Sequence, residues 1–168
     1  MNRRDPKLLW LQKHFAALRA RKKWAFLWRV WLEATIFAYL VSEVLEGLFH
    51  FPDRTDLNRY PPITLIALAL LLGPLWETLV FQCLPMEWAR SVRMQRFWRY
   101  AVSIAPFALG HRLAGIPTVV AAGLIGGFYF AFTYDRWRQE SLFVAVVMTF
   151  LLHSSFNLVG VLGMLLGR

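Results

Sequence analysis

Four residues in apolar surroundings have side chains suited to hydrolytic chemistry: Glu77, His111, His153 and Asn157. Glu77 follows the run ITLIALALLLGPLW, where a carboxylate is costly and is usually paired, turned inward or functional. A glutamate can act as a general base, a histidine can hold or move a proton, and histidine or asparagine N–H groups can stabilise an oxyanion. Together these residue types predict a site for hydrolysis.

The spacing of these residues favours a shared depth in a helical bundle. If the helix that carries Glu77 continues to a turn near 95–97, Glu77 lies about eighteen residues before that turn and His111 about fifteen after it. The offset of about three residues corresponds to only ~5 Å along two antiparallel helices. His153 and Asn157 are four residues apart, so they share one helix face.

Thr78 and Gln82 are also four residues apart and are expected to hydrogen-bond along their own helix. Glu77 lies about 100° around the helix from Thr78 and is free to point elsewhere. Taken singly, a buried histidine is more often structural than catalytic, and Asn157 could simply bind a neighbouring helix. The joint presence of one glutamate, two histidines and one asparagine favours the catalytic interpretation.

Composition predicts that the site lies in a membrane protein. The chain of 168 residues is 58% hydrophobic and has a mean hydropathy of +0.44, whereas soluble domains are roughly 45–50% apolar. The expected fold class is all-α, a polytopic membrane helical bundle. Apolar runs long enough for about five spans occur at about 30–49, from 61 onward, and at about 97–111, 116–134 and 142–166.

The prediction divides the chain into a basic segment over 1–29 and an integral membrane domain over 30–168. Apolar residues recur at three- and four-residue steps in the basic segment at Leu8, Leu11, Phe15 and Leu18. This pattern is typical of a basic amphipathic helix on an anionic membrane surface. A solvated basic tail is the alternative interpretation.

The net charge of +9 is distributed as a topology signal. Lys and Arg number 9 before the first span, 4 in 84–99 and 2 in 135–141, against 2 in 51–60, 1 in 112–115 and 1 at the end. The positive-inside rule then places the N-terminus in the cytoplasm. No nucleic-acid partner is expected, and the single cysteine, Cys83, excludes an internal disulfide.

Three motifs occur in order along the chain: ETLVFQ at 77–82, FALGH at 107–111 and HSSFN at 153–157. They resemble the motifs EExxxR, FxxxH and HxxxN or HxxxD of the CPBP intramembrane proteases, the CAAX-protease and bacteriocin-processing group that includes the type II CAAX prenyl proteases. The resemblance covers about 62–166. Thr78 and Gln82 stand where the family has glutamate and arginine, so a neutral pair replaces an ion pair.

The resemblance implies a glutamic-type intramembrane endopeptidase that hydrolyses a peptide bond of a membrane-associated protein or peptide. Glu77 would be the general base for a water held with His111, and His153 and Asn157 would donate hydrogen bonds to the oxyanion. No cofactor is expected. The alternative is a zinc ion bound by Glu77, His111 and His153, with water as the fourth ligand.

The remaining expectations concern supporting residues, partners and location. Thr78, Gln82 and Phe107 are expected to support the site. The partners are a membrane-anchored protein or peptide and the lipid bilayer, in a bacterial inner membrane. A non-catalytic immunity or scaffold protein with the same fold is the main alternative, and a small proton-linked transporter is a weaker one. Close helix packing is expected at Gly123, Gly126 and Gly127.

Overall fold

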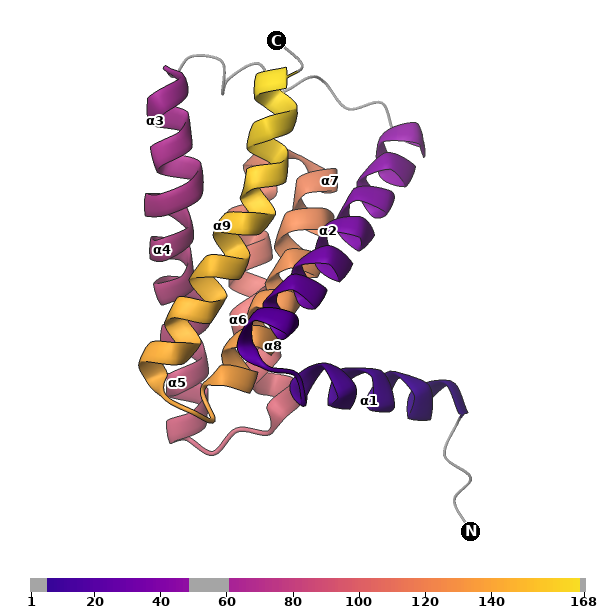
Figure 1. The fold of residues 1–168 in the computed structure, drawn as a ribbon, viewed down its shortest axis with the longest axis vertical. Coiled ribbons are helices and arrows are strands. Elements are labelled where there is room, and N and C mark those ends of the chain that lie inside the picture. Colours follow the sequence, from indigo (N-terminus) through magenta and orange to yellow (C-terminus); the bar gives the residue numbers. More distant parts are fainter. Residues whose placement is uncertain (1–5, 49–60, 167–168) are drawn as a thin grey trace.

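The computed structural model describes residues 6–48 and 61–166, which form helices and short turns with no strand in these ranges. Figure 1 shows upright helices packed side by side, with α1 lying across one end of the bundle. This architecture confirms the all-α prediction. The loop over 51–60 lies outside the described residues.

The helical elements follow one another along the chain with few interruptions. In order they are α1 (Pro6–Arg19), α2 (Lys23–Leu48), α3 (Pro62–Ala67), η2 (Leu68–Leu72), α4 (Gly73–Glu77), η3 (Thr78–Cys83), α5 (Leu84–Ser91), α6 (Arg96–Gly110), η4 (Arg112–Ala114), α7 (Ile116–Thr118), η5 (Val119–Gly126), α8 (Gly127–Trp137) and α9 (Leu142–Leu166). Elements α3 to α5 form one continuous helix, and α7 to α8 form another.

Four of these helices are long and apolar enough to cross a membrane: Lys23–Leu48, Ile63–Ser91, Ile116–Trp137 and Leu142–Leu166. The predicted third span forms as α6, which has 15 residues. Its length of roughly 22 Å is less than the roughly 30 Å hydrocarbon core of a bilayer. Helix α6 is instead packed into the bundle, where Ser103, Phe107 and Ala108 are buried.

The N-terminal segment is divided differently from the prediction. Helix α1 ends at Arg19, and α2 already begins at Lys23, before the predicted first span at 30. Leu18 on α1 is 2% exposed, and the Phe15 ring packs edge-on against Phe128 of α8. Part of the apolar face of α1 therefore packs on protein, not on lipid.

The basic segments lie at one end of the bundle. Figure 1 shows α1, the end of α5 and the start of α9 at the same end, and the start of α3 with the end of α9 at the other. The predicted turn after the Glu77 helix is present, since the helix ends at Ser91 and α6 begins at Arg96. Arg93 in this turn has a φ of 55°, a left-handed conformation that reverses the chain.

The glycine-rich segment brings its helix very close to α6. A Cβ atom on Gly123 would lie 2.6 Å from the Cα atom of Ala108, and one on Gly127 would lie 3.0 Å from the Phe107 ring. Real side chains do not approach a backbone this closely, so the contact requires glycine at 123. The predicted close packing is confirmed at Gly123 and Gly127, where it fixes the position of α6, whereas a Cβ on Gly126 would make only ordinary contacts at 3.5 Å or more.

Candidate functional site

Glu77 is the last residue of α4 and lies between two π-helical segments, η2 and η3. Such segments are rare and often occur at functional sites, because the wider turn changes the direction of nearby side chains. The Glu77 side chain is 31% exposed, whereas the next residue, Thr78, is fully buried. The two residues therefore point in different directions, as their positions on a helix predict.

Pro74 explains the irregular backbone before Glu77. Proline has no N–H group, so it removes a backbone donor for carbonyl groups in the preceding turn. Two side chains of α9 donate to carbonyls in that turn: Ser154 Oγ to Leu70 O at 2.8 Å and Asn157 Nδ2 to Ala69 O at 3.0 Å. Helix α9 thus supplies donors to carbonyl groups about two turns before Glu77, and these bonds position α9 against that helix.

The same arrangement is repeated after Glu77. Pro85 lacks the N–H that would bond the carbonyl of Phe81, four residues earlier. The Ser103 hydroxyl of α6 donates to this carbonyl at 2.7 Å. Glu77 therefore lies between two turns that each lack a backbone donor because of a proline, called here the proline-opened turns. In each turn a side chain of a neighbouring helix supplies the missing hydrogen bond.

A cavity of about 680 Å³ lies beside this helix, between α2, α9 and the end of α6. Its walls include Glu77, His111 and Asn157. The structure thus brings together, in the wall of one cavity, three of the four residues that sequence analysis selected. The volume lies within the range of about 300–1,000 Å³ that is typical of ligand pockets.

His153, the fourth residue, lies behind the carboxylate and is 2% exposed. Its Nε2 atom is 3.4 Å from Oε2 of Glu77. The Phe130 ring stacks on the imidazole at 4.2 Å between centroids, and the Phe107 ring meets it edge-on at 5.6 Å. These contacts hold the imidazole toward Glu77.

His111 follows the last residue of α6, and its orientation is also fixed. Its Nδ1 atom is 2.8 Å from the carbonyl oxygen of Phe107. A carbonyl oxygen can only accept, so Nδ1 carries the hydrogen and Nε2 of the neutral ring is an acceptor. Phe107 also packs against the His111 ring at 4.6 Å between centroids, so it contacts both histidines.

The predicted hydrogen bond between Thr78 and Gln82 is wrong. Both residues are fully buried, but Thr78 Oγ1 and both polar atoms of Gln82 have no partner within the described ranges. Residues 78–83 form a π-helical segment, which changes the relative direction of positions four apart from that in an α-helix. The sequence pattern contained no indication of this change.

Several polar residues close to the site were not predicted. Ser154 binds the proline-opened turn, and its position between His153 and Asn157 was the available signal. Thr149 is one turn before His153 on α9, and its buried hydroxyl has no partner in the described part of the chain.

No group of three or more His, Cys, Asp or Glu side chains that could hold a metal is present among residues 6–48 and 61–166. Glu77 and His153 approach each other, but the described geometry does not place a third such ligand with them. The zinc alternative stays a prediction, which metal analysis of the purified protein tests.

The apolar spans indicate an integral membrane protein, and the cavity wall carries a glutamate and a histidine, side chains that can take part in hydrolysis. A family model described as type II CAAX prenyl endopeptidase Rce1-like matches residues 58–159, more than half of the chain. The chain belongs to this family, which confirms the resemblance drawn from its motifs. No curated protein and no solved structure matches the chain.

Proposed function

We propose that this protein is an intramembrane endopeptidase in which Glu77 activates the hydrolytic water. The observation that carries the proposal is the position of the Glu77 carboxylate. It is partly exposed in the wall of a 680 Å³ cavity, shares that wall with His111, and lies 3.4 Å from His153. A base must be able to reach both water and substrate, and this carboxylate meets that requirement.

Glu77 and His111 together can orient one water molecule. The bond from Nδ1 of His111 to the Phe107 carbonyl leaves Nε2 as an acceptor, and an ionised Glu77 is also an acceptor. The two hydrogens of the water can bind one acceptor each, so an oxygen lone pair is free to attack a peptide carbonyl.

In the proposed reaction, Glu77 takes one proton from this water as the new carbon–oxygen bond forms. The resulting tetrahedral intermediate carries a negative oxygen. Collapse breaks the carbon–nitrogen bond, and Glu77 returns its proton to the leaving amine. The cycle releases an acid and an amine and restores the carboxylate.

His153 and Asn157 have different parts in this scheme. The Nε2 atom of His153 faces Glu77, so we assign His153 to holding the carboxylate in place. Asn157 donates one amide hydrogen to Ala69 and has a second one available on the cavity side. This second hydrogen is the better candidate for oxyanion stabilisation.

A metal-free mechanism is preferred because it leaves Glu77 free as the base. If Glu77 were a zinc ligand together with His111 and His153, another residue would have to take the proton from water.

The proposed substrate is a membrane-anchored protein or peptide. The family description supports a prenylated C-a-a-X protein as one candidate. We place the protein in a bacterial inner membrane, with the basic end of the bundle and the N-terminus in the cytoplasm, as the positive-inside rule suggests.

A non-catalytic immunity or scaffold protein is the second candidate. It is favoured by Thr78 and Gln82, which stand where the family pattern has glutamate and arginine.

Comparison of membrane-proteome termini in cells tests the proposal. Wild type and Glu77→Gln are expressed at matched levels, with Glu43→Gln, an exposed glutamate of α2, as the control. We expect new N- and C-termini with the wild type and Glu43→Gln, and their loss with Glu77→Gln. Identical termini in all three, with every protein folded and abundant, would contradict catalysis and favour the second candidate.

A further inference from the structure

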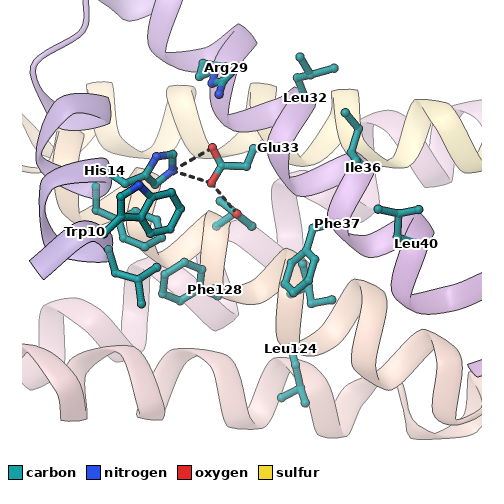
Figure 2. Close-up of a pocket in the computed structure, with 14 residues that line it drawn as sticks. Trp10, His14, Arg29, Leu32, Glu33, Ile36, Phe37, Leu40, Leu124 and Phe128 are labelled. Carbon is teal, nitrogen blue, oxygen red and sulfur yellow. Dashed lines mark hydrogen bonds and ion pairs between the residues drawn. The ribbon is translucent and has the colours of Figure 1, made fainter. Parts of the chain in front are cut away.

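A second cavity, of about 770 Å³, lies between α1, α2 and the helix formed by η5 and α8. Figure 2 shows its walls, which are mostly apolar and include Ile36, Phe37, Leu40, Leu124 and Phe128. The candidate catalytic cavity uses other positions of α2, such as 35 and 38. Helix α2 therefore separates two cavities, and the second one has no part in the proposed peptidase.

Polar groups gather at one end of this groove. Glu33 on α2 accepts a hydrogen bond from Tyr129 at 2.9 Å, and Nε2 of His14 on α1 lies 2.9 and 3.1 Å from its two oxygens. The Trp10 ring stacks on His14, with 5.6 Å between centroids. This cluster, visible in Figure 2, ties α1 to α2 at the polar end of the groove.

Arg29 is a charged residue at the polar end of the groove that forms no ion pair within the described residues. It lines the groove near Glu33 (Figure 2) and is exposed. Glu33 is already bound by His14 and Tyr129, and no other residue of the described ranges forms an ion pair with Arg29. The surrounding segment 1–29 contains 9 Lys and Arg and only one acid, Asp5. The groove entrance is therefore complementary to an anion.

The length and direction of the groove suit a lipid chain. Arg29 and Leu40 line its two ends and are eleven residues apart on α2, or roughly 16 Å. Half of the hydrocarbon core of a bilayer is roughly 15 Å. Trp10 at the polar end belongs to a residue type that prefers the membrane interface. A molecule with its charge at Arg29 would thus extend its apolar chain to about the middle of the membrane.

We propose that this groove binds an anionic phospholipid, with its phosphate beside Arg29 and one acyl chain along Ile36, Phe37 and Leu40. The chain would fill the space between α2 and the wall formed by Leu124 and Phe128. The lipid would stabilise the position of α2, whose other face lines the catalytic cavity. This inference holds whether or not the protein is a peptidase.

Photo-crosslinking of the purified full-length protein in nanodiscs tests the proposal. The probe is phosphatidylglycerol with a photoactivatable acyl chain, and phosphatidylcholine with the same chain is the comparison. We expect peptides that contain 29–40 and 124–129 to be labelled roughly fivefold more by the anionic probe, about the contribution of one interfacial Arg. Equal labelling by both probes, or labelling spread evenly over all helices, would overturn the proposal.

Two pairs of variants separate a bound lipid from diffuse attraction. Arg29→Gln should reduce the preference for the anionic probe roughly fivefold. Lys13 is an exposed cation of α1 outside the groove, so Lys13→Gln should reduce this preference less than about twofold. Leu40→Trp fills the groove and should abolish its labelling, whereas Leu72→Trp on the exposed side of another helix should not. Equal effects within either pair would contradict a specific site, and thermal unfolding checks that each variant is folded.

Discussion

Two buried polar regions of this bundle differ in how their groups are paired. At the basic end, Asp135 of α8 forms ion pairs at 2.6 to 3.5 Å with four arginines, Arg19, Arg90, Arg96 and Arg99. Around Glu77, by contrast, Thr78, Gln82 and Nδ1 of His153 have no hydrogen-bond partner among the described residues. The first region is a charge network that leaves Nε of Arg90 and of Arg99 without a hydrogen-bond partner among the described residues. In the second region the polar atoms of Thr78 and Gln82 are all left without one.

We interpret the Asp135 network as structural and the unpartnered groups around Glu77 as candidates for a functional role. The arginines of the Asp135 network come from α1, α5 and α6, so one carboxylate joins four helices. Buried polar groups without a partner are uncommon in native proteins and call for an explanation, such as a role in binding water or substrate. Helix α6 connects the regions, because it begins with Arg96 and ends beside His111.

The largest effect is expected when the charge network is broken by Asp135→Asn. The change leaves four arginines close together without their carboxylate, and removal of one member of a buried ion pair costs about 3–5 kcal/mol. Unfolding of the purified protein in detergent micelles measures this loss. The control is Glu140→Gln, whose exposed ion pair with Lys23 should contribute about 0–1 kcal/mol. Equal losses for the two variants would contradict a central role for Asp135.

Gly123→Ala tests the contact that places α6 in both regions. The new Cβ would meet the backbone of Ala108 at 2.6 Å, so α6 must move. Overpacking of this kind costs about 1–3 kcal/mol, and cleavage should also fall because His111 moves with α6. Gly163→Ala is the matched control, since no atom lies within 4 Å of its added Cβ. An unchanged unfolding temperature for Gly123→Ala would disprove the tight contact.

These two regions also show how far the sequence could be interpreted. Hydropathy predicted the long helices. The similar distances of Glu77 and His111 from the turn predicted that these two residues lie near each other. Both predictions succeeded because they depend only on the local helical geometry of the chain. The Asp135 network could not be predicted, since Arg19 and Asp135 are 116 positions apart and only the folded bundle joins them. The break between α1 and α2 falls after Arg19, not at the predicted boundary of 29 and 30.

The π-helical turns around Glu77 were also beyond the sequence analysis. Pro74 and Pro85 were visible in the sequence, but proline alone does not reveal which carbonyl groups lose their donor or what replaces it. That depends on Ser103 and Ser154, which come from other helices. For this reason the predicted Thr78–Gln82 pair failed, whereas the directions of Glu77 and Thr78 were predicted correctly.

Ser103→Ala and Ser154→Ala should each have a smaller effect on stability. Each removes a hydroxyl that donates to a carbonyl opened by proline, and hydrogen bonds between membrane helices contribute about 0.6 kcal/mol on average. Ser155→Ala is the control, because its hydroxyl bonds within its own helix to Leu151. Unfolding in detergent should rank Ser155→Ala as the mildest of the three. A larger loss for Ser155→Ala would show that the proline-opened turns do not need these donors.

The smallest change in stability is expected for Gln82→Leu, which is the sharpest contrast with Asp135→Asn. Gln82 is fully buried and has no partner in the described part of the chain, so a leucine of similar size removes no protein hydrogen bond. Such a replacement is nearly neutral or stabilising.

If the unpaired polar groups serve the reaction, cleavage should decrease while the unfolding temperature stays the same or rises. Thr149→Val, which removes another unpaired buried hydroxyl, should behave in the same way. A loss above about 1 kcal/mol for Gln82→Leu would mean that the side chain is held by a partner after all, and the contrast between the two regions would disappear.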